Sequence, residues 1–260
     1  MRRYDRYKIA TLILAIILLV ETVLVVYLLI TRPKKIPKVP PLRGKIAIVI
    51  DDWGYNLDNF YILEQIKYPL TVSVLPNLSY SRTVAAALNK RGIEIILHLP
   101  MEPHEKFRLE RNTILTSMDE QTIRNIIIQD LDDIFYAKGV SNHMGSKATE
   151  DLKTMRIIFS ELKKRNLFFL DCLVSPRTIC SRLANKMHLG FVKRDIFLDN
   201  KEEAGYIKQQ IRKLKTRARI YGQAVGIGHD RQITLEVLKE ITPELEKEGY
   251  EFIFISELVK

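Results

Sequence analysis

Short apolar runs and longer amphipathic stretches alternate along the chain after residue 44. The apolar runs are rich in Ile, Val, Leu and Phe, which is typical of strands buried on both faces. The expected strands are 45–50, 70–75, 93–97, 139–142, 167–171, 189–192, 222–228 and 251–255, and the clearest expected helices are 119–138, 150–165, 202–219 and 234–248. This alternation predicts parallel strands joined by crossover helices.

Five of the expected strands end in residues that titrate or bind metals. These residues are Asp51 with Asp52, His98, His143, Asp171 and His229. The carboxyl ends of parallel strands face a shared crevice, where acids, bases and metal ligands collect. An open doubly wound sheet would concentrate such residues at one switch point, whereas a closed ring directs all of them to one centre. We therefore expect an α/β barrel of seven or eight (β/α) units.

Residues 9–30 form an almost wholly apolar segment, interrupted by Thr11, Glu21 and Thr22. The segment is long enough to cross a bilayer as a helix, and one Glu costs only about 3 kcal/mol of insertion energy. A cleaved signal peptide is the alternative, but the apolar stretch is long for one and no small-residue cleavage pattern follows it. The sequence therefore predicts an uncleaved transmembrane anchor.

The anchor divides the chain into four expected parts. These are a short basic cytoplasmic tail at 1–8, the transmembrane helix at 9–30, a Pro- and Lys-rich linker at 31–43 and a folded domain at 44–260. Basic residues flank the anchor on both sides, so the positive-inside rule does not choose an orientation. The site chemistry described below favours a domain that faces the periplasm or the cell exterior.

The positive charge of the chain is concentrated near the anchor. The formal charge is +10, of which residues 1–45 contribute +8, so that residues 46–260 carry only +2. Basic residues beside a membrane attract anionic lipid headgroups. The remainder lacks a nucleic-acid motif of interleaved basic and aromatic residues. We expect a membrane partner and no nucleic-acid partner, and the sequence carries no signal for a particular oligomeric state.

The chain contains two cysteines, Cys172 and Cys180. This number excludes a disulfide-rich scaffold and a structural zinc module with paired knuckles. The two thiols could form a disulfide in an oxidising compartment. Alternatively, Cys172 is a small buried residue beside Asp171. The sequence is compatible with both arrangements.

Asp52, His98 and His143 offer a ligand set of mixed oxygen and nitrogen donors. Such a set suits a catalytic divalent metal, zinc above all, with positions left open for water. A neighbouring carboxylate can take a proton from that water, and Asp51 is the candidate base. Adjacent strand residues point to opposite faces, so both aspartates can serve one site only if the strand ends there. The following Trp53 and Gly54 favour such an end.

His229 follows Gly226-Ile-Gly228 at the end of a late strand. We expect it to act as a general acid or to stabilise an oxyanion, with the glycines leaving room for a ligand or for backbone. The glycines are not a dinucleotide fingerprint, because the third glycine is missing. His104 and His188 lack a strand-end position, and we expect them at the surface.

Six short runs resemble the divergent polysaccharide deacetylase family. They follow the family's order across most of residues 45–260, and they are Ile50-Asp-Asp-Trp-Gly-Tyr-Asn56, His98-Leu-Pro-Met-Glu-Pro103, Asn142-His-Met-Gly-Ser146, Phe168-Phe-Leu-Asp171, Arg194-Asp-Ile-Phe-Leu-Asp199 and Ile227-Gly-His229. The resemblance implies a deformed (β/α)7–8 barrel of the glycoside hydrolase/deacetylase type and a metal-dependent esterase acting on amino sugars. It also implies the site roles, which are Asp51 as base, Asp52, His98 and His143 as metal ligands and His229 as acid.

The sequence departs from the typical deacetylase pattern at one metal position. The usual second histidine, four residues after the first, is replaced by Glu102. We therefore assign the third ligand to His143, with Glu102 as the fallback. The usual arginine and aspartate-tryptophan motifs are not evident, and residues of the matched runs are the candidates for their roles. The candidates for substrate binding or support, besides Glu102, are Trp53, Asn142, Asp171, Arg194 and Asp195.

These observations predict a membrane-anchored, metal-dependent hydrolase that removes acetyl groups from an N-acetylated envelope glycan. The alternative is a catalytically inactive barrel that binds a glycan or an envelope protein, because fold alone does not guarantee activity. A glycosidase with Asp51 and Asp52 as its acid pair is disfavoured. Such carboxylates are usually separated by about 5 Å or more across the sugar, which neighbouring residues rarely achieve.

Overall fold

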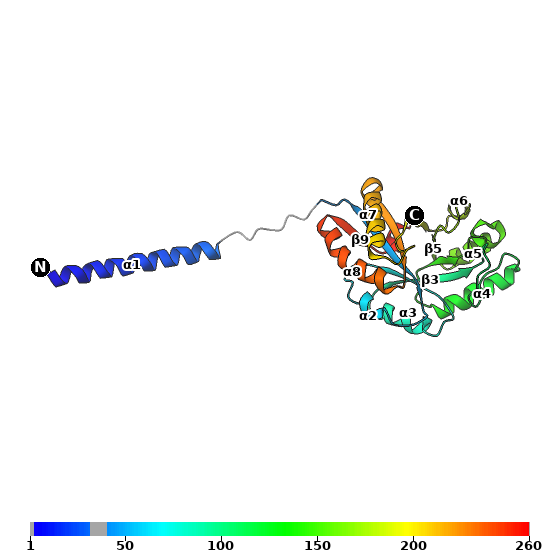
Figure 1. Ribbon diagram of the computed structural model, residues 1–260, viewed down its shortest axis with the longest axis horizontal. Coiled ribbons are helices and arrows are strands. Elements are labelled where there is room, and N and C mark those ends of the chain that lie inside the picture. Colours follow the sequence, from blue (N-terminus) through cyan, green and yellow to red (C-terminus); the bar gives the residue numbers. More distant parts are fainter. Residues whose placement is uncertain (1–2, 32–40, 260) are drawn as a thin grey trace. The chain divides into compact units, whose positions relative to one another are not determined.

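A long apolar helix and a folded domain make up two separate units of the chain (Figure 1). The computed structural model describes residues 3–31 and 41–259. The first unit contains helix α1 (Arg3–Ile30), which from Tyr7 onward is long and apolar enough to cross a membrane. The predicted linker at 31–43 and the start of the predicted tail lie largely outside the described residues.

The folded domain is built on one parallel sheet. Its strands are β1 (Gly44–Trp53), β2 (Thr71–Val74), β3 (Glu94–Met101), β4 (Gly139–Met144), β5 (Phe168–Asp171), β6 (Phe191–Lys193), β7 (Ile196–Phe197), β8 (Gln223–His229) and β9 (Tyr250–Ile253). The strand order is β6-β5-β4-β3-β2-β1-β8-β7, and β9 pairs with the beginning of β1. Strand β1 therefore pairs with three strands, β2, β8 and β9.

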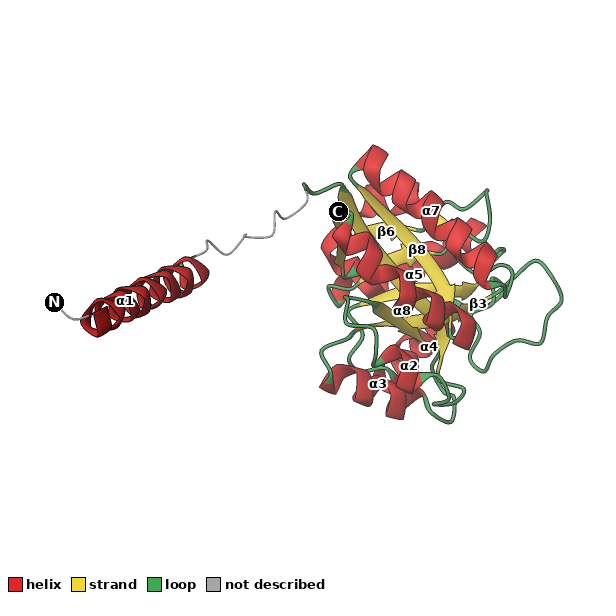
Figure 2. Cartoon of the chain, turned by 60° about the vertical axis from the view of Figure 1, so that its left-hand side comes forward, coloured by secondary structure: helices red, strands yellow, loops and turns green. Residues whose placement is uncertain are grey.

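Helices cover the outer side of the curled sheet, as Figure 2 shows. They are α2 (Phe60–Leu63), α3 (Ser81–Lys90), α4 (Glu120–Asp133), α5 (Leu152–Lys164), α6 (Cys180–Met187), α7 (Ala204–Tyr221) and α8 (Gln232–Lys247), with short 3₁₀ turns η1 (Ala148–Glu150) and η2 (Ile255–Leu258). Asp119 and Asp151 begin α4 and α5 as N-caps, each accepting a backbone N–H three residues later.

The two edges of the sheet come together where the chain passes from β6 to β7. No ladder joins these two strands within the described part of the chain. Instead the backbone N–H of Arg194 donates to Asp171 O on β5 at 3.0 Å, and that of Asp195 donates to Val225 O on β8 at 2.9 Å. Two consecutive residues thus bond to opposite edges of the curled sheet. The prediction of a deformed barrel is confirmed.

Alternate strand residues face two different apolar cores. The outer core combines strand residues such as Ile46, Ile48 and Ile50 with residues of the covering helices. The inner core lies inside the curl and is formed by strand residues, by Cys172 just after β5 and by the C-terminal segment, namely Ala47, Val49, Ile96, Phe168, Leu170, Cys172, Val192, Val225, Ile227, Ile253, Ile255 and Leu258. Because it contains both cores and every strand, the compact unit from residue 40 onward meets the structural requirements of a domain that folds by itself.

Each of the eight predicted strands overlaps an observed strand, and the four clearest predicted helices form. The helix expected at 119–138 ends at Asp133, because the chain must turn to bring Lys138 N–H to Ile95 O beside β4. The predictions did not include the short helix α2, the helices α3 and α6, or the two-residue strand β7. The apolar run Ile196-Phe-Leu198 is too short to predict a strand by itself, and the pairing of β7 with β8 depends on the closing of the curl.

Asp130 on α4 is fully buried. Asn77 Nδ2 donates to its Oδ1 at 2.7 Å, while its Oδ2 has no hydrogen-bond partner in the part of the chain that the structure describes. Burial is the largest influence and raises the pKa of Asp130 to about 7, against the hydrogen bonds from Asn77 and Asn112. The folded protein therefore retains this proton to higher pH than the unfolded chain, in which an Asp titrates near about 4. The associated stability is lost as the pH rises through about 7.

We predict that Asp130→Asn, which mimics the protonated acid, removes this loss. From pH 5 to pH 8 the unfolding free energy of the unsubstituted domain should fall by about 2 kcal/mol more than that of the variant. Urea unfolding of residues 40–260 at both pH values measures this difference. The exposed neighbour Asp132, changed to Asn, is the control. An equal pH dependence in Asp130→Asn and the unsubstituted domain would contradict the prediction.

Candidate active site

A bulge near the end of β1 brings two successive aspartates into one site. The register between β1 and β2 shifts between Ile50 and Trp53, and Asp52 has a left-handed backbone conformation with φ 67°. Aspartate tolerates this conformation better than most residues, and residues held in such conformations are often found at functional sites. The expectation that the strand ends at the aspartates is corrected. The strand continues to Trp53. The left-handed conformation of Asp52, and not a strand end, brings both carboxylates into one site.

Asp52, His98 and His143 come together at the carboxyl ends of β1, β3 and β4. One potential ligand atom from each lies within 4.8 Å of the others. Asp52 Oδ1 is 3.2 Å from His98 Nε2 and 3.1 Å from His143 Nδ1. Ligand atoms bonded to one tetrahedral zinc at about 2.0–2.2 Å lie about 3.4 Å apart. The donor set and its spacing therefore fit a divalent metal ion.

The electrostatics of Asp52 also suit a cation ligand. Burial tends to raise its pKa, but the hydrogen bonds and positive charge of His143 and His98 outweigh burial and hold the pKa well below the usual range. The carboxylate is therefore ionised at neutral pH, which is the form that binds a metal.

A serine pair orients His98 from below the site. His98 Nδ1 is hydrogen-bonded to Ser141 Oγ at 2.7 Å, and Ser141 Oγ is bonded to Ser73 Oγ at 2.6 Å. Both serines are fully buried. A metal-binding histidine usually bonds through its other nitrogen to such a partner, which fixes the ring. Sequence reasoning missed this pair, whose only signal is a polar residue in an otherwise apolar strand.

Asp51 lies deeper than the three potential ligands. It is 2% exposed, its Oδ1 has no hydrogen-bond partner among the described residues, and its Oδ2 is 3.8 Å from His98 Nε2. Burial, the largest influence, raises the pKa of Asp51; the charge of His98 opposes this and that of Asp52 adds to it. A buried carboxyl with a raised pKa beside a potential metal site has the character of a general base.

His229 is held by a buried carboxylate that sequence reasoning missed. Asp199 accepts hydrogen bonds from the His229 backbone N–H and from its Nδ1, each at 2.8 Å, and from Thr234 Oγ1 at 2.7 Å. Burial lowers the pKa of His229, but the hydrogen bond and charge of Asp199 outweigh it, so the pKa is raised. Asp199 is fully buried and ends the run 194–199 that resembles the deacetylase family. Its partner His229 lies 30 residues later in the chain, so no local pattern connects the two residues.

The glycines before His229 serve packing. A Cβ at Gly226 would lie 2.8 Å from Leu214, and one at Gly228 would lie 2.9 Å from Thr234. Helices α7 and α8 therefore approach β8 closely at these positions. The room that the glycines leave is occupied by side chains of the outer core, and the expectation of room for a ligand is corrected.

Arg194 packs against Phe197, the neighbour of His229. Its guanidinium lies 3.7 Å from the centre of the Phe197 ring, which stacks on His229 with ring centroids 5.8 Å apart. Arg194 also donates to Cys172 O at 2.7 Å and to Leu173 O at 3.0 Å. These contacts tie the loop after β5 to the His229 side of the site.

The remaining predicted residues lie around the site, chiefly in supporting positions. Trp53 is fully buried in the outer core, edge-on to Phe60. Asn142 Oδ1 accepts the Cys172 N–H at 2.9 Å, and Asp171 accepts the Leu173 N–H and the Thr178 hydroxyl. Asp195 faces α7, where it pairs with Arg217. These side chains shape loops and are not among the clustered potential ligands.

Glu102 is engaged away from the potential ligands. Its carboxylate accepts hydrogen bonds from the backbone N–H and the hydroxyl of Thr116, both at 2.6 Å. It also forms an ion pair with Lys147 at 2.7 Å. It thereby fixes the long loop after β3. The same loop is tied to the strand end of β1, because Tyr55 donates its hydroxyl hydrogen to Glu110.

Both cysteines are free and buried. Cys172 Sγ lies 3.6 Å from Asp51 Oδ2, as a weak donor to that carboxylate. Of the two arrangements that the sequence allowed, the structure has the reduced one.

The family model described as divergent polysaccharide deacetylase matches residues 48–259. The uncharacterized protein YibQ of Escherichia coli K12 is 35% identical over 206 residues, an alignment that covers 79% of this chain and 65% of YibQ. This chain therefore spans slightly less than two thirds of that relative.

Two solved structures share the fold. An uncharacterized protein from Agrobacterium tumefaciens C58 superposes with a TM-score of 0.78 at 20% identity, covering 83% of this chain and 89% of that one. The Bc1960 peptidoglycan N-acetylglucosamine deacetylase superposes with a TM-score of 0.53 at 15% identity, covering 82% and 86%. With a family match over most of the domain and this shared fold, the chain belongs to the divergent polysaccharide deacetylase family.

Proposed function

We propose that the protein is a metal-dependent deacetylase of an envelope glycan. The observation that carries the proposal is the cluster of Asp52, His98 and His143 directly beside the buried Asp51. The family match supports the reaction class, and the peptidoglycan deacetylase named above, which shares the fold, supports an N-acetylated amino sugar as substrate. The candidate membrane helix α1 supports a place in the cell envelope.

The chain's own groups can supply the proton transfers of amide hydrolysis. A divalent cation, zinc above all, held by Asp52, His98 and His143 would supply Lewis acidity toward the acetyl carbonyl and toward water. Asp51, whose Oδ1 has no protein partner, is positioned to take the proton of an attacking water. The low exposure of Asp51 excludes most bulk water, which strengthens its electrostatic interactions.

His229 is positioned to donate a proton to the leaving amine. Asp199 bonds to Nδ1, which leaves Nε2 for the substrate, and the raised pKa favours the protonated ring. Arg194 and Phe197 restrict the ring from its face. The pair Asp51 and His229 thus provides a base and an acid from neighbouring strands β1 and β8, whose ladder aligns these two residues directly.

The first prediction concerns metal content. The domain, residues 40–260, should bind about one equivalent of zinc or a similar ion, and His98→Ala and His143→Ala should each lose it. Elemental analysis after dialysis measures the content. His188→Ala is the matched control, since His188 is exposed on the turn after α6. A domain that remains metal-free when supplied with zinc, cobalt or nickel would contradict the site and favour the inactive barrel.

The second prediction separates the base from the ligands. Asp51→Asn should retain the metal but reduce acetate release from an N-acetylglucosamine tetramer by about 100-fold or more, because the proton acceptor is lost. Steady-state acetate assays and elemental analysis together test this. Asp58→Asn, an exposed residue after the same strand, is the control. Unchanged turnover in Asp51→Asn would remove it from the mechanism, and glycan binding without turnover by the unsubstituted protein would favour the inactive barrel.

The third prediction concerns the pH profile. Asp199 raises the pKa of His229, so the protonated acid persists to higher pH than it would without Asp199. Asp199→Asn should lower kcat by about tenfold or more and move the basic limb of the kcat profile to lower pH. Asp195→Asn, in the same sequence run but facing α7, should leave that limb in place. A basic limb that does not move in Asp199→Asn would exclude His229 as the acid.

A further inference from the structure

Basic residues gather at the end of the domain opposite the candidate active site. In a parallel sheet, the turns that lead from helices into strands all lie at the amino ends of the strands. The last turns of α3, α5, α6, α7 and α8 carry Lys90, Lys163, Lys164, Lys186, Arg219 and Lys247. The turns themselves add Lys67, Arg91, Lys138 and Arg165. We call this set the basic end face.

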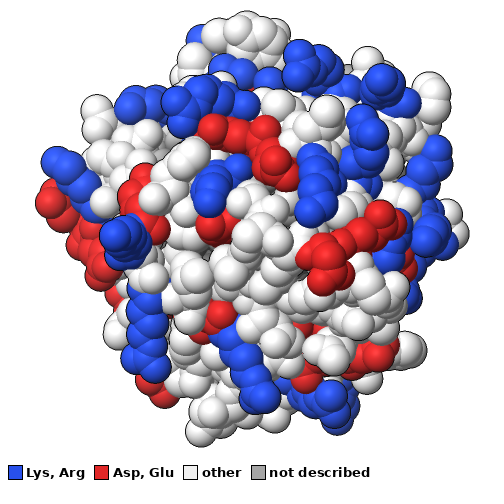
Figure 3. All heavy atoms as spheres, turned by 90° about the vertical axis from the view of Figure 1, so that its right-hand side faces the viewer, with Lys and Arg blue, Asp and Glu red and all other residues white. Residues whose placement is uncertain are grey.

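Several of these charges have no counter-ion in the domain. Glu64 pairs with Arg91, Glu161 pairs with Lys164 and Arg165, and Glu248 pairs with Lys215. No described carboxylate forms an ion pair with Lys90, Lys138, Lys186, Arg219 or Lys247. Figure 3 shows one side of the molecule, on which acidic and basic side chains are interspersed. These five cations of the basic end face are therefore free to attract an anionic partner.

Large apolar side chains protrude from the same end. Phe135, in the turn before β4, is 79% exposed; Ile220 and Tyr221, at the end of α7, are 63% and 66% exposed. The helix dipole explains basic residues at helix ends, but it does not explain exposed apolar residues beside them. Basic residues combined with exposed aromatic and aliphatic ones are typical of surfaces that enter the lipid headgroup region.

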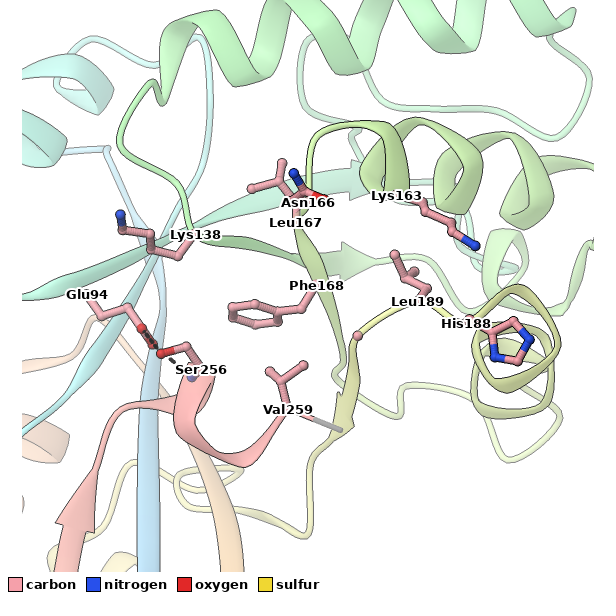
Figure 4. A pocket seen from close by; sticks show the side chains of 11 residues that line it. Glu94, Lys138, Lys163, Asn166, Leu167, Phe168, His188, Leu189, Ser256 and Val259 are labelled. Carbon is pink, nitrogen blue, oxygen red and sulfur yellow. Dashed lines mark hydrogen bonds between the residues drawn. The ribbon is translucent and has the colours of Figure 1, made fainter.

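A hollow with an apolar floor opens on this end. It has a volume of about 600 Å³ and is lined in part by Lys138, Lys163, Phe168, Leu189 and Val259, and also by Glu94, whose carboxylate accepts hydrogen bonds from Thr71 and Ser256. Figure 4 shows the two lysines on opposite sides of the three apolar residues. The hollow therefore repeats, on a smaller scale, the arrangement of cations around an apolar surface.

The chain enters the domain at this same end. The Arg43 N–H donates to Gly249 O and the Lys45 N–H to Gly222 O, both at 2.8 Å, so that the entering segment runs beside the ends of α7 and α8. Leu42 next to it is 62% exposed. Thirteen residues, 31–43, separate α1 from β1, a span of at most about 45 Å. If α1 crosses a bilayer, this tether keeps the basic end face at high local concentration near the lipid.

We propose that the basic end face, together with Leu42, Phe135, Ile220 and Tyr221, docks on an anionic phospholipid surface. Docking in this way directs the carboxyl ends of the strands, and with them the candidate active site, away from the lipid. The proposal does not rest on deacetylase activity, because lipid binding is measured without substrate and without metal.

The test is sedimentation of the domain, residues 40–260, with vesicles of phosphatidylcholine alone or with added phosphatidylglycerol. We expect binding only to the anionic vesicles, and weaker binding at higher salt. Each basic residue removed near the surface should weaken binding about fivefold. Lys138→Glu/Lys186→Glu and, separately, Ile220→Ser/Tyr221→Ser should each weaken it at least about tenfold.

The matched control carries equivalent changes at the opposite end of the domain. Phe107→Ser/Arg108→Glu, in the exposed part of the loop after β3, should bind anionic vesicles as the unsubstituted domain does. Equal binding to both vesicle types, or an equal loss in the control, would overturn the proposal. Retention on a soluble polyanion such as heparin without vesicle binding would also overturn it, because the partner would then be an acidic macromolecule.

Discussion

Asp52 holds a left-handed conformation within β1, and the whole candidate site depends on it. In a regular strand Asp51 and Asp52 would point to opposite faces, one inside the curl and one toward the helices. The bulge redirects Asp52 so that its carboxylate meets His98 and His143 while Asp51 stays on the inner face. A conformation of this kind costs of order 1–3 kcal/mol, and it persists only where the surroundings impose it. Strand β1 is suited to impose it, because β2, β8 and β9 all bond to it.

The inside of the curl is divided along its axis into an apolar base and a polar upper layer. Val49, Ile96, Leu170 and Ile227 form a floor without hydrogen-bonding side chains. Above it Asp51 is buried with one oxygen unpaired, which is costly for a charged group unless other charges compensate for it. The neighbouring histidines provide part of that compensation. The floor thus excludes water from the side of Asp51 that faces the core and makes the charge of Asp51 more effective.

The two ends of the same sheet have opposite chemical characters. The carboxyl ends hold acids and imidazoles turned inward, in positions that the closing of the curl brings together. The amino ends present cations and exposed apolar side chains outward. The separation follows from the parallel topology, because every crossover returns the chain to the same end before a new strand begins. Substitutions at the amino ends can therefore change the proposed lipid docking without altering the candidate active site at the carboxyl ends, and the reverse also holds.

The sequence by itself determined the alternation of strands and helices, the family and the residues at the strand ends, because apolar periodicity and short motifs are local properties. Asp52, His98 and His143 were identifiable for that reason. Only the tertiary structure decided how these residues meet. The bulge in β1, the Ser73 and Ser141 support of His98, and the Asp199 partner of His229 each require contacts between strands that are distant in the chain. Such contacts exist only after the sheet has curled, and no local pattern records them.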